Sequence, residues 1–215
     1  MRLEGAIFDM DGTLLDSMGI WKTLCSDLMR ELGRDPEPGL DRKVQQMGLR
    51  FGAAYCRKRY ALEQSEDELI ELVQSRVSRF YREEAPAKPG AARFLSLLKM
   101  QGVWMYLATA MDRALAEAAL RRTGLLEYFR GMLTCTEAGC GKDTPLLYEK
   151  CLTRLQCSRD QCVVFEDSLP AIRTAKSAGF RVAAVWDSAS EADQPEIQRL
   201  ADEYIRSYQD FFRTV

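Results

Sequence analysis

Two aspartates two positions apart, Asp9 and Asp11, lie directly after a short apolar run in the segment Asp9-Met10-Asp11-Gly12-Thr13. A carboxylate is a competent nucleophile toward phosphorus and forms an aspartyl phosphate. A second carboxylate beside it can protonate the leaving oxygen and later activate water. Gly12 allows backbone amides to approach an anion closely. The segment therefore favours phosphoryl transfer, and the alternative for so short a motif is a solvated acidic turn.

Three further places carry candidate groups, each just after an apolar run. The hydroxyl of Thr109 and the amides beside it could bind phosphoryl oxygens, although Thr is also a routine helix cap. Lys142 could neutralise the nucleophile and the transferring group, or could be an ordinary surface lysine. Glu166 and Asp167 could join Asp9 in a hard oxygen site that suits Mg²⁺, and Asp167-Ser168 could also cap the following helix. Because ligands bind at the carboxyl ends of parallel strands, we expect these groups to share one site.

The composition narrows the chemistry. The 215 residues include seven Cys and no His, so mechanisms that need an imidazole are excluded within this chain. The net charge of −2 gives no electrostatic reason to expect nucleic acid or an anionic membrane as a partner. The apolar runs are far shorter than a membrane span, and an acid interrupts the N-terminal segment before a signal peptide could form. We therefore expect a cytoplasmic protein with reduced thiols.

Apolar runs and helical segments alternate along most of the chain. The runs at 3–9, 103–109, 131–135, 162–167 and 182–186 predict strands, and helices are expected at 91–100, 114–122, 145–155 and 171–177. Continuous apolar strands that alternate with helices are typical of a parallel sheet covered on both faces. We predict an α/β fold with three layers.

Between the first strand and the rest lies a long segment with helical periodicity. Apolar residues from Trp21 to Leu32 recur at helical spacing and stop at Gly33. A second helix is expected to begin at Ser65, because Glu68 three residues later completes the pattern of a capping box. We therefore predict an inserted all-helical cap domain over residues 17–85, within a core domain of residues 1–16 and 86–215.

Two Cys-x4-Cys pairs, Cys135 with Cys140 and Cys157 with Cys162, are the one pattern that points to another metal. Structural zinc sites typically have two to four residues between ligands, so this spacing is a poor match. Cys162 would also begin a buried strand. We interpret these residues as buried, inert thiols.

The motifs occur in a familiar order: Phe8-Asp9-Met10-Asp11-Gly12-Thr13, Leu107-Ala108-Thr109, Gly141-Lys142 and Val164-Phe165-Glu166-Asp167. Over essentially its whole length the chain resembles the haloacid dehalogenase-like hydrolase superfamily, in the branch with a small helical cap like that of β-phosphoglucomutase. The resemblance implies a Rossmann-like core beside the cap.

The resemblance also implies roles for the motif residues. Asp9 would be nucleophile and Mg²⁺ ligand, and Asp11 the acid and base, with its backbone carbonyl on the metal. Thr109 would bind the phosphoryl group and Lys142 would orient and neutralise it. Asp167 would be a further Mg²⁺ ligand, and Glu166 would bind the ion directly or through a water molecule.

Substrate contacts are less defined. Asp143 stands where the family usually has Pro after the lysine, which puts the shape of that loop in doubt. In the cap, Arg50 is the candidate for contact with a phosphorylated sugar, and Trp21 and Lys22 could also face the substrate; packing or solvent exposure is the alternative for all three. We add Ala110, beside Thr109, to the candidate substrate residues.

These inferences together predict a Mg²⁺-dependent phosphatase for a small phosphomonoester such as a sugar phosphate or a nucleotide. A phosphomutase using the same residues is the nearest alternative. A metal-independent dehalogenase would leave Asp11 and the Glu166-Asp167 pair idle, and a phospho-accepting receiver domain would need no large helical insertion. The expected partner is a small phosphorylated metabolite, and the expected state is a monomer or weak homodimer; the sequence does not identify the substrate.

Overall fold

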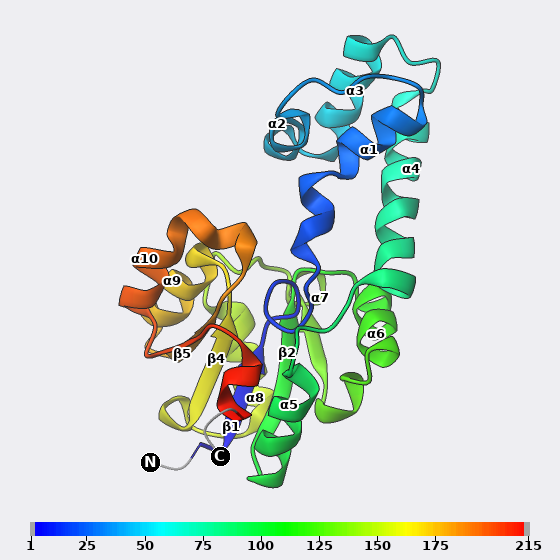
Figure 1. Cartoon of the computed structure of the whole chain (residues 1–215). Coiled ribbons are helices and arrows are strands. Elements are labelled where there is room, and N and C mark those ends of the chain that lie inside the picture. Colours follow the sequence, from blue (N-terminus) through cyan, green and yellow to red (C-terminus); the bar gives the residue numbers. More distant parts are fainter. Residues whose placement is uncertain (1–2, 213–215) are drawn as a thin grey trace. The chain divides into compact units, whose positions relative to one another are not determined.

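A computed structural model describes residues 3–212. The chain forms two compact units, one made of the chain up to Ser17 together with the chain from Ala85 onward, and the other of Met18–Glu84. The first unit contains a sheet with helices, and the second is helical throughout (Figure 1). No helix within residues 3–212 is long and apolar enough to cross a membrane.

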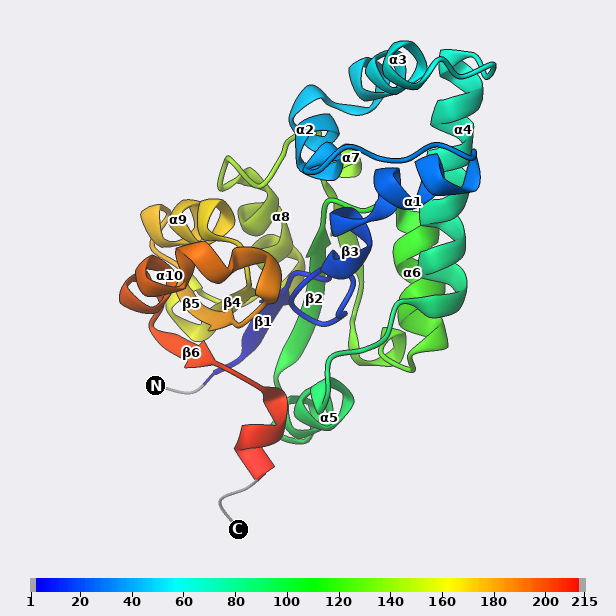
Figure 2. The same ribbon diagram turned by 45° about the horizontal axis from the view of Figure 1, so that its top comes forward.

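The sheet of the first unit has six parallel strands in the order β3-β2-β1-β4-β5-β6 (Figures 1 and 2). Their bounds are Gly5–Phe8 (β1), Trp104–Thr109 (β2), Met132–Thr134 (β3), Cys162–Glu166 (β4), Arg181–Val185 (β5) and Glu203–Ile205 (β6). The predicted α/β fold with a parallel sheet is confirmed. The sixth strand was missed, because Glu203–Ile205 begins with a charged residue and contains no continuous apolar run.

Helices of the first unit pack against this sheet. The helix α8 lies against β1, β2 and β3, α9 lies against β4 and β5, and α5 lies against β2. The α-helices are α5 (Ala91–Met100), α6 (Arg113–Arg122), α7 (Cys135–Ala138), α8 (Leu146–Leu155), α9 (Leu169–Ser177) and α10 (Gln194–Leu200). The short 3-10 helices are η3 (Leu126–Tyr128), η4 (Arg159–Gln161), η5 (Ser188–Asp193) and η6 (Tyr208–Phe212).

Successive residues of β1 fill the core on opposite faces of the sheet. Ile7 belongs to the cluster that includes Tyr148 of α8 and Val164 of β4. On the other face Phe8 stacks on Phe165, with ring centroids 4.1 Å apart and planes 7° from parallel. Both β1 residues are fully buried, which stabilises the fold by about 1.5–3 kcal/mol for each such side chain. This burial anchors the strand whose end carries Asp9.

The second unit contains four α-helices with their own apolar core. The elements are η1 (Met18–Lys22), α1 (Leu24–Glu31), α2 (Leu40–Met47), α3 (Leu49–Tyr60), α4 (Glu66–Arg79) and the π-helical turn η2 (Phe80–Glu84). The predicted capping box is confirmed: the Ser65 hydroxyl accepts from the Glu68 amide at 3.2 Å, and the Ser65 amide donates to the Glu68 carboxylate at 2.7 Å. Trp21 was wrongly included in the first helix, since it lies in the 3-10 turn before α1.

Candidate active site

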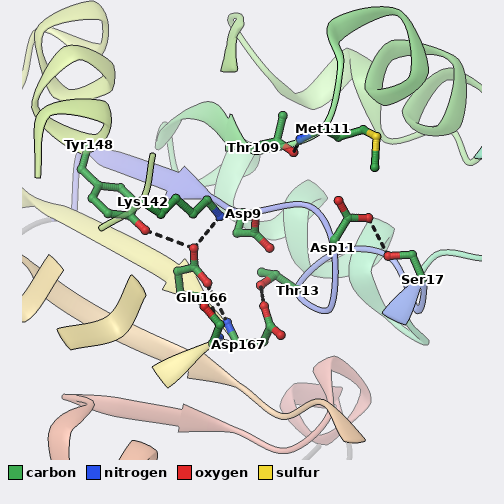
Figure 3. A network of polar contacts seen from close by, with 11 residues as sticks. Asp9, Asp11, Thr13, Ser17, Thr109, Met111, Lys142, Tyr148, Glu166 and Asp167 are labelled. Atoms are coloured by element: carbon green, nitrogen blue, oxygen red, sulfur yellow. Dashed lines mark hydrogen bonds and ion pairs between the residues drawn. The ribbon is translucent and has the colours of Figure 1, made fainter. Parts of the chain in front are cut away.

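Asp9 and Glu166 come together because their strands are neighbours in register. Phe8 pairs with Phe165, so Asp9, which follows β1, and Glu166, the last residue of β4, lie at the same edge of the sheet. The Asp9 amide donates to the Phe165 carbonyl at 3.0 Å and keeps the two segments together one residue past the strand. Asp9 is 5% exposed and Glu166 is 1% exposed, so both carboxylates are withdrawn from water. Figure 3 shows both residues beside the end of the Lys142 side chain.

Lys142 lies between these two acids (Figure 3). Its Nζ donates to Asp9 Oδ1 and, at 2.5 Å, to Glu166 Oε1, although 133 positions separate it from Asp9 in the sequence. Burial alone would lower the pKa of Lys142, but the Asp9 and Glu166 carboxylates outweigh it and raise this pKa well above its usual value. Lys142 is therefore a permanent positive charge beside Asp9.

Four groups hold Glu166. Lys142 and the Tyr148 hydroxyl, at 3.1 Å, both donate to Oε1. The amides of Asp167 and Ser168 donate to Oε2 at 3.1 Å and 3.4 Å. Because both oxygens are engaged, this carboxylate orients Lys142 as well as adding negative charge to the site. No role for Tyr148 was predicted from the sequence. It reaches Glu166 because α8, which carries it, packs against the sheet.

Asp167 is held by the loop that follows Asp9. The Thr13 hydroxyl donates to Asp167 Oδ1 at 3.1 Å. Gly12 has φ +79°, and a Cβ there would lie 2.3 Å from Asp167 Oδ2, so the loop needs glycine both for its left-handed backbone and for space. Asp167 does not cap α9: the N-cap is Ser168, which makes no side-chain capping bond.

The three acids Asp9, Glu166 and Asp167 offer carboxylate oxygens that lie within 4.8 Å of one another. Burial, together with the neighbouring Glu166 and Asp11 charges, raises the pKa of Asp9 to about 7 against the opposing effect of Lys142. Burial and the charges of Asp9 and Glu166 raise the pKa of Asp167 well above its usual value as well. Three buried carboxylates facing one ammonium have excess negative charge, and hard oxygens are the ligands that Mg²⁺ prefers. The donor set fits that ion.

Asp11 belongs to the loop that follows Asp9, but its side chain is directed away from Asp9. Its Oδ1 accepts a hydrogen bond from the Ser17 hydroxyl at 2.6 Å, and Figure 3 shows its carboxylate directed at Ser17 rather than at Asp9. Asp11 nevertheless lies close enough to raise the pKa of Asp9. To act as acid and base it must rotate away from Ser17, whose involvement no sequence pattern indicated.

Thr109 ends β2 and is fully buried. Because Leu107 pairs with Phe8, Thr109 stands beside the loop that follows Asp9. Its Oγ1 accepts from the Met111 amide at 3.0 Å, which holds the turn after the strand (Figure 3). Ala110 follows and is exposed.

The predicted cap residues belong to the second unit. Arg50 forms an exposed ion pair with Asp67 at 3.0 Å. Trp21 lines a cavity inside that unit, and Lys22 is exposed. Their contact with a substrate stays a prediction.

Tyr208 is a further supporting residue that was not singled out from the sequence. The Tyr208 hydroxyl donates to the Thr13 carbonyl at 3.2 Å, beneath the loop that carries Asp11 and Gly12. Tyr208 is 195 positions away along the chain, so no local spacing could have indicated this contact.

Known proteins resemble this chain in sequence and in structure. A family model described as haloacid dehalogenase-like hydrolase matches residues 3–179. Hexitol phosphatase B of Escherichia coli K12 is 30% identical over 208 residues, which cover 94% of this chain and 90% of that protein. A phosphorylated carbohydrates phosphatase of Thermotoga maritima is 29% identical over 178 residues, 83% of this chain and 82% of the relative. A Thermotoga maritima crystal structure described as a candidate β-phosphoglucomutase superposes with a TM-score of 0.85 at 25% identity, covering 99% of this chain and 100% of the other.

Proposed function

The chain belongs to the haloacid dehalogenase-like hydrolases, and from that premise we propose that it is a Mg²⁺-dependent phosphatase of small phosphomonoesters that forms an aspartyl phosphate on Asp9. The observation that carries the proposal is a buried Asp9 paired with Lys142 and adjacent to Asp167. A family hydrolase with this arrangement has a nucleophile, a fixed cation and an oxygen site for a divalent ion.

The first chemical step is attack on phosphorus. A carboxylate oxygen of Asp9 forms the new P–O bond while the bond to the leaving alcohol breaks. Lys142 neutralises the carboxylate and the phosphoryl oxygens, and Thr109 with the amides after it holds the phosphoryl group. Asp11, once rotated away from Ser17, gives its proton to the leaving oxygen.

The second step returns Asp9 to its free state. Ionised Asp11 takes a proton from a water molecule, and that water attacks the aspartyl phosphate to release inorganic phosphate. Asp9, Asp167 and the Asp11 carbonyl would hold Mg²⁺, with Glu166 as a further ligand directly or through water. The ion, when bound, would screen repulsion between the anionic nucleophile and the anionic phosphate.

For the substrate we propose a phosphorylated sugar or sugar alcohol, with nucleotides as a second class. The support is the pair of relatives named as phosphatases of hexitols and of phosphorylated carbohydrates. We also propose that the Met18–Glu84 unit is the cap that selects the substrate, through Arg50, Trp21 or Lys22.

Phosphomutase activity is the second candidate, because one structural neighbour is described as a β-phosphoglucomutase. A mutase would return the phosphoryl group to a sugar instead of to water. Conversion of a hexose 1-phosphate to its 6-phosphate, primed by the bisphosphate and without net phosphate release, would identify this reaction and exclude hydrolysis as the main activity.

The test is phosphate release from p-nitrophenyl phosphate and from a panel of hexitol, sugar and nucleoside phosphates, with Mg²⁺ and with EDTA. We expect Mg²⁺-dependent turnover, with phosphate trapped on Asp9 in acid-quenched samples. Asp9→Asn should abolish both turnover and trapping, because it removes the nucleophilic oxygen. Asp16→Asn is the matched control, since Asp16 is an exposed acid at the end of the same loop. Full activity in the Asp9 variant would end the proposal.

A further inference from the structure

The second unit contains a partly open cavity of about 260 Å³ with mostly apolar walls. Its lining comes from η1, α1, α2, α3 and α4, so this unit alone forms it. Two cysteines, Cys25 of α1 and Cys56 of α3, are part of this wall. The proposed phosphatase chemistry uses neither thiol.

The two thiols are in contact with each other. Their Sγ atoms lie 3.5 Å apart, and the residues are 31 positions apart in the sequence. A disulfide bond is about 2.05 Å long, so the sulfurs must approach by about 1.5 Å, a distance within reach of side-chain rotation and a small helix shift. Both cysteines are free. The pair is therefore placed for oxidation without unfolding of the unit.

The cavity provides the access that buried thiols usually lack. Cys25 is 8% exposed and Cys56 is 3% exposed, values at which a thiol is ordinarily inert. Here the thiols border a space wide enough for several water-sized molecules, so a small uncharged oxidant can reach the sulfurs from the cavity. Hydrogen peroxide and other small hydroperoxides are oxidants of this class.

The two sulfurs also differ in acidity. Either sulfur can donate in the hydrogen bond between them. With Cys25 as the donor, the bond lowers the pKa of Cys56, and the same contact, followed by burial, raises the pKa of Cys25. Asp41, whose carboxylate caps the start of α1 at the Cys25 and Ser26 amides, adds negative charge that raises the pKa of both thiols and does not reverse the difference between them. Because the thiolate is the reactive form, Cys56 is the sulfur that reacts first and Cys25 is the one that resolves.

We propose that Cys25 and Cys56 form a modification site, at which a small hydroperoxide converts the two thiols into a reversible disulfide that joins α1 to α3. The Cys56 thiolate attacks one peroxide oxygen, the O–O bond breaks, and the departing hydroxide is protonated to water, leaving a sulfenic acid on Cys56. The Cys25 sulfur then attacks the Cys56 sulfur, the S–O bond breaks, and the departing hydroxide takes the Cys25 proton. Two thiols are oxidised by two electrons, and one peroxide is reduced to two waters or, for an organic hydroperoxide, to an alcohol and water.

The experiment treats the full-length protein with a series of hydrogen peroxide concentrations, blocks the remaining thiols with a maleimide, and maps tryptic peptides without reduction. Trypsin places Cys25 in the peptide 23–30 and Cys56 in the peptide 51–57, so the cross-link is a single defined species. We expect this species to appear with loss of two of the seven thiols, and a dithiol reductant to restore both. Seven unmodified thiols, or a disulfide confined to other cysteines, would overturn the proposal.

Variants separate the two sulfurs. In Cys25→Ser, Cys56 should stop at the sulfenic acid, which a 1,3-dione reagent traps; in Cys56→Ser, Cys25 should stay reduced at the same peroxide dose. Cys157→Ser is the matched control, because Cys157 lies near another cysteine, Cys162, in the first unit. The 23–30 to 51–57 cross-link should form unchanged in it. If the pair variants fail to fold, the wild-type peptide map still decides the question.

Discussion

Replacing Lys142 by Met tests the electrostatics of the candidate active site most directly. The substitution keeps much of the side-chain volume but leaves Asp9 and Glu166 facing each other without their shared cation. Removal of one partner from a buried ion pair costs about 3–5 kcal/mol, because the remaining charge stays desolvated and unpaired. We expect a loss of this size in the free energy of unfolding of the metal-free protein at pH 8.

Protonation of the acids should make this loss depend on pH. Lys142 lowers the pKa of Asp9, which nevertheless stands at about 7 because of burial, so the variant's Asp9 pKa should rise further. An acid whose folded pKa exceeds its unfolded pKa binds more protons in the native state, so stability falls as pH rises from about 4 to the folded pKa. Each carboxylate that is protonated in the native state but ionised in the unfolded state then lowers the free energy of unfolding by about 3 kcal/mol between pH 6 and pH 8. In the wild-type protein Asp9 should contribute about half of this loss, since it titrates in the middle of that interval.

The measurement is urea unfolding in EDTA at pH 6 and pH 8, for the wild type and for Lys142→Met. Lys150→Met is the matched control, because Lys150 Nζ donates to the Ala138 carbonyl at 2.8 Å instead of to a carboxylate. The control should lose about 1 kcal/mol or less, equally at both pH values. A Lys142 variant as stable as the wild type at pH 8, or one destabilised equally at both pH values, would refute the reasoning.

Three further outcomes are expected. Gly12→Ala should destabilise the protein by at least about 1 kcal/mol in urea unfolding and weaken Mg²⁺ binding in titration calorimetry, because φ there is +79° and the new Cβ would lie 2.3 Å from Asp167 Oδ2; unchanged binding would contradict this. Asp11→Asn should slow hydrolysis of an alkyl phosphate by about 10²–10⁴-fold, and an unchanged rate with that poor leaving group would rule out its role as acid and base. Mg²⁺ affinity should increase as pH rises from 6 to 8, because the raised pKa values of Asp9 and Asp167 oblige the ion to displace protons; an affinity independent of pH would speak against these shifts.

Much of the site's location follows from patterns along the chain. The runs that end at Phe8, Thr109 and Glu166 are continuous and apolar, as in strands buried on both faces, and the helices between them require a parallel arrangement. Parallel strands have their carboxyl ends at one edge, so the residues that follow them gather there. The meeting of Asp9 with Glu166, and the family to which the chain belongs, could therefore be predicted from the amino-acid sequence alone.

The side-chain contacts that decide how the site operates could not be predicted from the sequence. Lys142 was expected beside Asp9, but its bond to Glu166 was not. Ser17 holding Asp11 away from Asp9 and Tyr208 beneath Thr13 likewise depend on how a loop turns or join separate segments. The same holds for Cys25 and Cys56, which are unremarkable in the sequence and adjacent only because α1 and α3 share a core. Periodicity and spacing reflect local backbone preferences and burial. Side-chain partners are selected by packing between segments far apart in the chain, so only the tertiary structure determined them.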